Sequence, residues 1–448
     1  MNIHIIDLVI FVLYLVFMLG VGCYFLNKNR SQKDYYVGGR NMSAGHIGLS
    51  VVAIDVGGFS IGLGGLGFVM VLSGSWTLFT GVLGAWLSAC LLIPKVYPLA
   101  KKHRFLMFPE FLAHYYNTKV ALIAGIISLL GYIGFTSSQI LAGAKLAAAT
   151  FPDIAITNAI LIMGVIAVIY TVIGGIKAVI QWIILMVGLV GIGIPIGFIE
   201  IGGWNAIRET LPVEFLSLHN IRFIDLFNWC ITIVPIWFVG MTLYQRIYAC
   251  KDEQTAKKAW LIAGLFEYPV TAFMGVALGL FSRVALEQGM FTSIGYASDT
   301  SMDPELGLPL LLRTILPVGL MGLMMSAYFS AIMSTADSCL MGASGNLTTD
   351  IFGYSKGTIR IRNSQFITFL IGVLAIIIAT KMENVLEWML YSYAFMVSGL
   401  LGPVLGTLWF KKPSSLAALV GMILGGSITL TLILLNLKLP YGLDANFF

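Results

Sequence analysis

Long apolar segments separated by short polar stretches run from one end of the chain to the other. They fall at roughly residues 5–26, 44–72, 76–98, 120–150, 157–175, 178–200, 225–250, 258–282, 308–346, 362–380, 384–410 and 415–436. A helix needs about 20 apolar residues to cross the hydrocarbon core of a bilayer, and each segment has about that length or more. The pattern therefore predicts an all-α polytopic membrane protein with about twelve transmembrane helices.

The second predicted helix is unusually rich in glycine. The stretch "DVGGFSIGLGGLGF" contains Gly57, Gly58, Gly62, Gly64, Gly65 and Gly67. Each glycine costs a helix about 1 kcal/mol relative to alanine. One interpretation is close packing against neighbouring helices, where small residues are enriched in membranes. The other is a helix broken near the middle of the membrane, with backbone carbonyls facing a cavity.

A second candidate break lies in the seventh predicted helix, at Pro235 and Gly240 in "ITIVPIWFVGMTLYQR". Two interrupted helices five positions apart in the helix order are typical of an inverted repeat of five helices.

Composition and charge agree with a membrane protein and indicate its orientation. The 448 residues are 58% hydrophobic and 10% charged, whereas about a quarter of the residues in soluble domains are charged. If the loop after the first helix is inside, all but seven of the 26 lysines and arginines lie on inside loops or helix ends. The positive-inside rule then places both termini outside, in a multi-pass protein of the plasma (inner) membrane. The net charge of +5 reflects this topology, so we expect no nucleic-acid partner.

An enzymatic function is not indicated. The longest polar stretches are too short to fold as separate domains, and the sequence shows neither a nucleophile paired with a base nor a cluster of metal ligands. The expected partners are the lipid bilayer, a small-molecule solute and an ion, bound by a protein that functions as a monomer.

Three carboxylates lie well inside predicted helices: Asp55, Glu267 and Asp337. A charged side chain at the centre of a bilayer costs about 2.5 kcal/mol or more on insertion scales, so such residues usually have a function. Glu267 has two interpretations, a group of the pocket or of proton coupling, and an acid hydrogen-bonded to a neighbouring helix.

The ninth predicted helix contains a polar face. Ala331, Ser334, Thr335 and Ser338 are spaced i, i+3, i+4 and i+7, so they lie on one side of the helix. Such hydroxyls often donate to the carbonyl four residues earlier. Two adjacent hydroxyls and a carbonyl also suit a hard cation, which prefers oxygen ligands. Together with carbonyls of a broken second helix, this face predicts a sodium or proton site between helices two and nine.

Several motifs in the expected order resemble the sodium:solute symporter family. "AIMSTADSCLMGASGNLTTDIF" is similar to the family's ninth-helix signature, and "DYYVGGRNMSAGHIGLS" and "FPEFLAHYYNTK" are similar to its loops around helices two and three. The resemblance implies a LeuT-like core in helices two to eleven, built as two inverted repeats of five helices. The implied divisions are 1–43 for the first helix and loop, 44–224 and 225–412 for the two repeats, and 413–448 for the last helix and tail.

The resemblance also implies a sodium site, with sodium as the coupling ion. Its implied ligands are Ala53 and Val56 on helix two and Ala331, Ser334 and Thr335 on helix nine. "AIDVGG" resembles a stretch that is important for sodium in sodium/proline symporters, which makes Asp55 a candidate for ion binding or coupling together with Asp337 and Ser338. Where many members have an aspartate after "GGIKAV", this chain has Trp182 and Ile183, which argues against a second sodium site.

The function implied is sodium-coupled import of a small organic solute, an amino acid, an organic acid or a sugar, by alternating access. The expected solute pocket contains Gly57, Gly58, Phe59, Tyr132, Ser138, Gln139, Trp237, Thr242 and Tyr393. For the aromatic residues among them, packing within the bundle is an equally good interpretation. The alternatives are a proton-coupled or uncoupled carrier of the same fold and a transporter-like membrane sensor.

Overall fold

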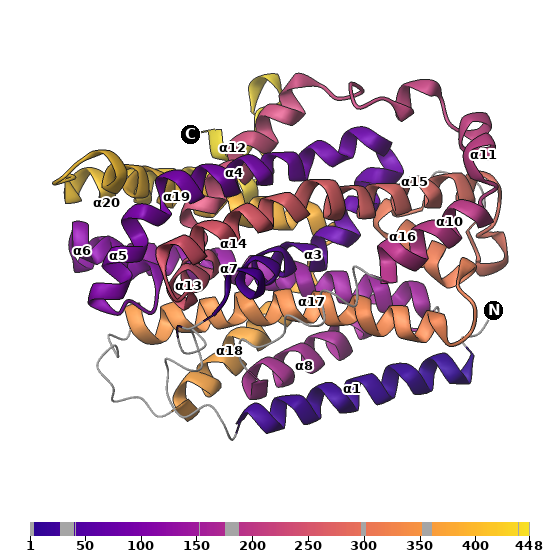
Figure 1. The fold of residues 1–448 in the computed structure, drawn as a ribbon, viewed down its shortest axis with the longest axis horizontal. Helices are drawn as coiled ribbons and strands as arrows, with labels where there is room; N and C mark the ends of the chain where they lie inside the picture. The colour runs from indigo at the N-terminus through magenta and orange to yellow at the C-terminus, as the bar shows by residue number, and fades with distance from the viewer. Residues whose placement is uncertain are drawn as a thin grey trace.

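Almost all of the described chain is helical. A computed structural model of the protein describes residues 4–26, 40, 42–151, 153–174, 188–296, 302–351, 361–437 and 439–447, and this part contains no β-strand. Figure 1 shows most of the long helices lying side by side in a bundle. The α-helices are α1 (Ile5–Leu26), α3 (Ala44–Val69), α4 (Trp76–Leu91), α5 (Ile93–His103), α6 (Phe108–Tyr115), α7 (Thr118–Thr150), α8 (Ile156–Gly174), α10 (Ile194–Glu200), α11 (Gly203–Thr210), α12 (Phe223–Val239), α13 (Met241–Ala249), α14 (Glu253–Phe266), α15 (Phe273–Glu287), α16 (Pro304–Ile315), α17 (Leu320–Gly345), α18 (Ile361–Ala379), α19 (Val385–Trp409) and α20 (Ser415–Leu434).

Each predicted apolar segment contains helix in its described part, although several segments are divided. The segment predicted at 308–346 forms two helices, α16 and α17, so the prediction of one long helix was wrong there. The physical reason is local: Leu316 is extended before Pro317, and Gly319 has a φ of 88°. A residue before proline is driven out of the helical region, and a positive φ favours glycine.

The described helices fit a multi-pass membrane protein. Six of them are long and apolar enough to cross a membrane, or up to nine if each of three bent pairs is one span. Large apolar side chains are exposed along α1, α18 and α20, for example Leu13 at 63%, Phe366 at 62% and Ile423 at 50%. Exposed apolar side chains of this size are unusual on water-facing helices and are expected where a helix faces lipid.

Helix α3 lies at the centre of the bundle and packs against α14, α15, α16 and α17. Its later glycines allow these contacts, because a Cβ on Gly64 would come 2.9 Å from Leu308 Cβ and one on Gly67 would come 2.7 Å from Val276 Cα. Close packing therefore explains the glycines in the second half of α3.

Two breaks in the bundle occur where the glycine and proline patterns predicted them. Helix α3 bends by 54° between Ala44–Ala53 and Gly57–Val69. Helices α12 and α13 meet at 42°, with Gly240 in an extended conformation between them. Pro235 lies inside α12, so the break is at Gly240 alone.

A buried ion-pair network joins three helices at one end of α7. Lys145 Nζ donates to Asp303 Oδ2 and to Glu305 Oε2, each at 2.6 Å. Glu305 is also the acceptor for the first backbone N–H groups of α19, from Val385 at 2.8 Å and Leu386 at 3.0 Å. A carboxylate at a helix N-terminus satisfies donors that have no partner within the helix.

We expect Glu305→Ala to lower the free energy of unfolding by about 3 kcal/mol, because it leaves buried Lys145 with one partner and α19 without its cap. Denaturant or thermal unfolding of the purified protein in detergent measures this. The matched control is Glu253→Ala, whose more exposed carboxylate pairs with Lys257 at 2.7 Å and should cost less than about 1 kcal/mol. Equal losses in the two variants would contradict a structural role for the network.

Candidate sodium site and solute pocket

Three oxygen atoms from α3 and α17 meet at the bend of α3. Thr335 Oγ1 lies 3.1 Å from the carbonyl oxygen of Ala53 and 3.2 Å from that of Ala331. Thr335 is fully buried, and Ala53 and Ala331 are nearly so. The Thr335 hydroxyl has one proton to donate and two lone pairs that can accept or bind an ion. Its oxygen and the two carbonyl oxygens therefore form a compact set of possible ligands. Hard cations prefer such ligands.

Gly57 makes this approach of the two helices possible. A Cβ at this position would overlap the hydroxyl of Thr335 and lie 2.9 Å from the carbonyl oxygen of Ala331. Any side chain here would push α17 away from α3. The glycine-rich stretch therefore has two roles. Gly57 allows the close approach at the bend of α3, and the later glycines allow close packing against neighbouring helices.

The other residues predicted for ion binding differ in what the structure shows of them. Ser334 is buried one position before Thr335. The side chains of Val56 and Asp55 lie outside the described residues, as do Trp182 and Ile183. Asp337 is 2% exposed, and its Oδ1 has no hydrogen-bond partner among the described residues.

Ser338 links the polar face of α17 to a buried arginine on α13. Its hydroxyl donates to the carbonyl of Ser334 at 3.0 Å and accepts from Arg246 Nη2 at 3.0 Å. Arg246 also donates to Ser50 Oγ and to the carbonyl of Thr242, both at 3.1 Å. A fixed positive charge thus lies between α3, α13 and α17, one helical turn beyond the cluster around Thr335.

Helix α7 supplies a polar side chain to each of the two breaks. At the bend of α3, Gln139 Oε1 accepts from the backbone N–H of Gly58 at 2.7 Å. At the start of α13, Tyr132 OH accepts from the backbone N–H of Thr242 at 3.1 Å and lies 3.2 Å from its hydroxyl. The two residues are seven positions apart and share one face of α7. Backbone donors that a bend leaves exposed inside a membrane need such partners.

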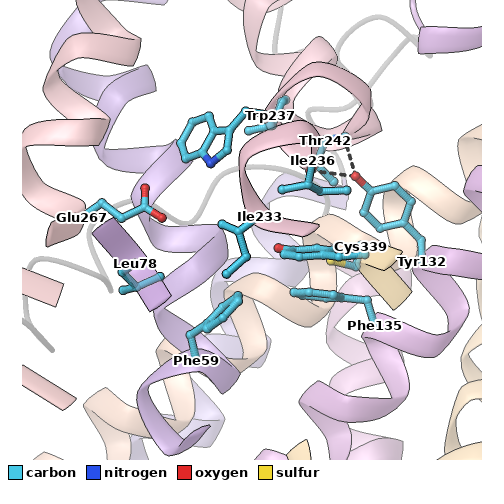
Figure 2. A pocket seen from close by; sticks show the side chains of 13 residues that line it. Phe59, Leu78, Tyr132, Phe135, Ile233, Ile236, Trp237, Thr242, Glu267 and Cys339 are labelled. Atoms are coloured by element: carbon cyan, nitrogen blue, oxygen red, sulfur yellow. Dashed lines mark hydrogen bonds between the residues drawn. The ribbon is translucent and has the colours of Figure 1, made fainter. Parts of the chain in front are cut away.

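A small pocket lies beside this face, between α3, α7 and α12 (Figure 2). Its cavity volume of about 20 Å³ is close to the space that one water molecule occupies. The walls of the pocket must therefore move apart before a solute can bind there. The lining residues are Phe59, Leu78, Tyr132, Phe135, Ile233, Ile236, Trp237, Gly240, Thr242, Leu243, Glu267, Cys339 and Tyr393.

Five of the residues predicted for solute binding line this pocket: Phe59, Tyr132, Trp237, Thr242 and Tyr393. The other four, Gly57, Gly58, Ser138 and Gln139, do not. Gln139 binds the backbone of Gly58, and the hydroxyl of Ser138 donates to the carbonyl of Phe135 at 2.7 Å within α7.

Eight of the lining residues were not in the predicted set, and two of them, Phe135 and Glu267, bear on what the pocket can bind. Phe135 stacks on Tyr393 with ring centroids 4.9 Å apart, and the helical spacing i, i+3 from Tyr132 was a signal for it. Glu267 was recognised as a carboxylate inside a helix, with a group of the pocket as one interpretation, and the structure places it on the pocket wall.

Comparison with known proteins places this architecture among secondary transporters. A family model described as the sodium:solute symporter family matches residues 35–425. The high-affinity proline transporter PutP of Bacillus subtilis is 27% identical over 440 residues, which cover 92% of this chain and 88% of that protein. The sodium/glucose cotransporter of Vibrio parahaemolyticus is 25% identical and covers 97% of this chain and 86% of its own length.

Solved structures show the same fold. A substrate-bound, outward-open sodium-coupled sialic acid symporter superposes with a TM-score of 0.79 at 21% identity, over 99% of this chain and 93% of its own. The nucleobase-cation-symport-1 family transporter Mhp1 has a TM-score of 0.56 at 14% identity, over 83% and 79%. The fold is therefore the LeuT-like fold that the paired helix breaks and the family resemblance predicted. Because the family model spans most of the sequence, this chain belongs to the sodium:solute symporter family, whose members are transporters and not enzymes.

Proposed function

We propose that this protein imports a small organic solute together with one sodium ion, by alternating access across the plasma membrane. In this proposal both termini face outside, a single copy in the bilayer is sufficient for transport, and the repeats span 44–224 and 225–412. The distribution of lysine and arginine among the loops supports the orientation. One sodium ion that moves inward across about 100 mV contributes about 2.3 kcal/mol, enough to concentrate a solute more than tenfold.

The observation that carries the proposal is the meeting of Ala53 O, Ala331 O and Thr335 Oγ1 at the bend of α3. Sodium would bind all three oxygen atoms, and the Thr335 hydroxyl, still protonated, would turn its O–H away from the two carbonyls and offer a lone pair to the ion. Ser334 and Val56 are the further ligands that we propose, next to these atoms along α17 and α3. Asp55, at the same bend, would add negative charge near the ion.

Sodium at this position can act on the solute pocket through the two helices that it joins. Phe59, two residues after Gly57, lines the pocket from α3, and Cys339, one turn after Thr335, lines it from α17. An ion that fixes α3 against α17 therefore also fixes two of the pocket walls. Coupling requires only that sodium and solute favour the same arrangement of these helices.

Arg246 supports a stoichiometry of one sodium ion. Its guanidinium already donates to the hydroxyl of Ser338, the last residue of the polar face of α17. A second cation on Asp337 and Ser338 would lie next to this fixed positive charge, and repulsion between like charges is strong where water is excluded. We therefore propose that the positive charge of Arg246 takes the place of a second sodium ion. In this proposal the negative charge of Asp337 balances that of Arg246.

We expect Gly57→Ala to abolish most of the stabilisation by sodium, because the added methyl group separates α3 from α17. Sodium at about 100 times its dissociation constant should stabilise the wild-type protein by about 2.7 kcal/mol. The measurement compares thermal unfolding in sodium and in potassium at equal ionic strength. Gly421→Ala is the matched control, because no atom lies within 4 Å of its added Cβ. The same sodium effect in both variants would contradict the site.

We also expect Thr335→Val to reduce sodium-driven uptake by at least about tenfold, the loss that follows when one interaction with a charged partner is removed. Thr335→Ser keeps the hydroxyl and should keep most of the activity. Purified protein in liposomes is screened for uptake of labelled amino acids, sugars and organic acids, with and without an inward sodium gradient. Uptake that does not depend on sodium but increases with an inward proton gradient would favour a proton-coupled carrier. Unchanged sodium dependence in Thr335→Val would remove this residue from the site.

A further inference from the structure

Glu267 is a buried carboxylate on the wall of the solute pocket, and the sodium site does not use it. It is 2% exposed and begins the π-helical turn Glu267–Ala272 between α14 and α15. Pro269 lies within this turn. Proline lacks an N–H and collides with the carbonyl four residues earlier, and a π-turn accommodates both defects. The irregular backbone thus fixes the direction of Glu267 within an otherwise regular span.

The neighbouring helix leaves space for this carboxylate. A Cβ on Gly81 of α4 would lie 3.0 Å from Glu267 Cδ and would overlap Oε1. Glu267 therefore packs directly against the backbone of α4. In Figure 2 its carboxylate points toward the space between Trp237 and Ile233.

Aromatic rings form much of the remaining wall. Trp237, next to Glu267 in Figure 2, is 2% exposed. Phe135 stacks on Tyr393, and Phe59 lies 6.1 Å from Tyr393 between ring centroids. The faces of aromatic rings carry partial negative charge and attract cations, tryptophan most strongly.

The charge of the pocket is one-sided. Among the described residues that line it, Glu267 is the sole carboxylate, and none is a lysine or an arginine. The hydroxyls of Tyr132 and Thr242 lie 3.2 Å apart and bind each other. An anionic group in this pocket would face the carboxylate of Glu267, whereas an ammonium group would find that carboxylate and aromatic faces.

We infer that the transported solute carries an ammonium group, which Glu267 binds while the rings of Phe59, Phe135, Trp237 and Tyr393 hold its carbon skeleton. This inference rests on the proposed function and narrows its solute class to amines and amino acids. Sugars and organic acids without an amine are then poor ligands. Selectivity follows from two sources, attraction to the positive group and repulsion of negative groups by the same carboxylate.

A series of small molecules that differ only in charge tests this. The probes share a five-membered ring or a short linear chain: pyrrolidine and butylamine as cations, proline and 4-aminobutyrate as zwitterions, cyclopentanecarboxylate and butyrate as anions, and cyclopentanol and butanol as neutral molecules. Dissociation constants come from thermal-unfolding titrations of the purified full-length protein. We expect at least one amine-bearing probe to bind about tenfold or more tightly than its anionic and neutral counterparts.

Variants of Glu267 give the second part of the test. Glu267→Gln should weaken binding of the amine by about 30-fold, the effect of removing one partner of a buried charge pair, and Glu267→Asp should weaken it less. Glu287→Gln is the matched control and should change nothing, since this carboxylate lies at the other end of α15 and pairs with Arg283 at 2.7 Å. Unchanged melting temperature without probe shows that each variant is folded.

The outcomes separate this inference from the proposed function. Equal affinity of wild-type protein and Glu267→Gln for the amine, preference for an anionic or neutral probe, or no binding by any amine would overturn the inference. Sodium-driven uptake together with equal amine affinity would leave the proposed function standing without it. Amine binding that depends on Glu267 but is indifferent to sodium would support the inference and count against sodium coupling.

Discussion

Backbone donors and acceptors at a bend inside a membrane have no water to bind, so a transporter with broken helices must supply partners from its own side chains. Here one helix supplies them for both breaks. Gln139 accepts from Gly58 at the bend of α3, and Tyr132 accepts from Thr242 at the start of α13. Two residues seven positions apart on one face of α7 thus contact the two irregular segments. The carbonyl of Ala53 at the α3 bend accepts from the hydroxyl of Thr335, and the pocket is lined by residues that follow both breaks, such as Phe59 and Thr242.

Two neighbouring features lie along α3 and α17, the oxygen cluster around Thr335 and the pocket beside it. The first is a set of uncharged oxygen atoms around Thr335, suited to a small hard cation. The second is a pocket lined by aromatic residues and by Glu267, suited to an organic cation or zwitterion. Arg246 donates to the hydroxyl of Ser338, and Lys145 forms buried ion pairs with Asp303 and Glu305. Buried pairs of this kind contribute little net stability but strongly favour one arrangement of the helices that they join.

Much of the fold could be predicted from local sequence patterns. The length of the apolar segments predicted the helices, because the thickness of the hydrocarbon core sets the minimum length of a helix that crosses it. Gly240 and the start of the glycine-rich stretch marked the breaks, because only glycine allows the close approach seen at Gly57. The division of residues 308–346 into α16 and α17 was missed, although Pro317 and Gly319 were signals for it. Hydrophobicity alone does not distinguish one bent span from two helices that are both buried.

The pocket was harder to predict because its walls come from helices far apart in the chain. Periodicity places Tyr132 and Phe135 on one side of α7, but it does not show which helix faces that side. Glu267 and Gly81 are 186 positions apart, and their contact follows from a π-turn and from the packing of α4 against it. Gln139 was predicted as a solute ligand, and in the structure its Oε1 accepts from the backbone N–H of Gly58.

The central claim is that a sodium ion joins α3 to α17 at Ala53, Ala331 and Thr335. An experimental structure determined in sodium and again in potassium, at a resolution that shows ordered ions, tests it most directly. We expect an ion in the sodium structure that contacts Thr335 Oγ1 and both carbonyl oxygens, and no ion there in potassium. Direct hydrogen bonding of Thr335 to Ala53 in both structures, with sodium bound elsewhere or nowhere, would contradict the account.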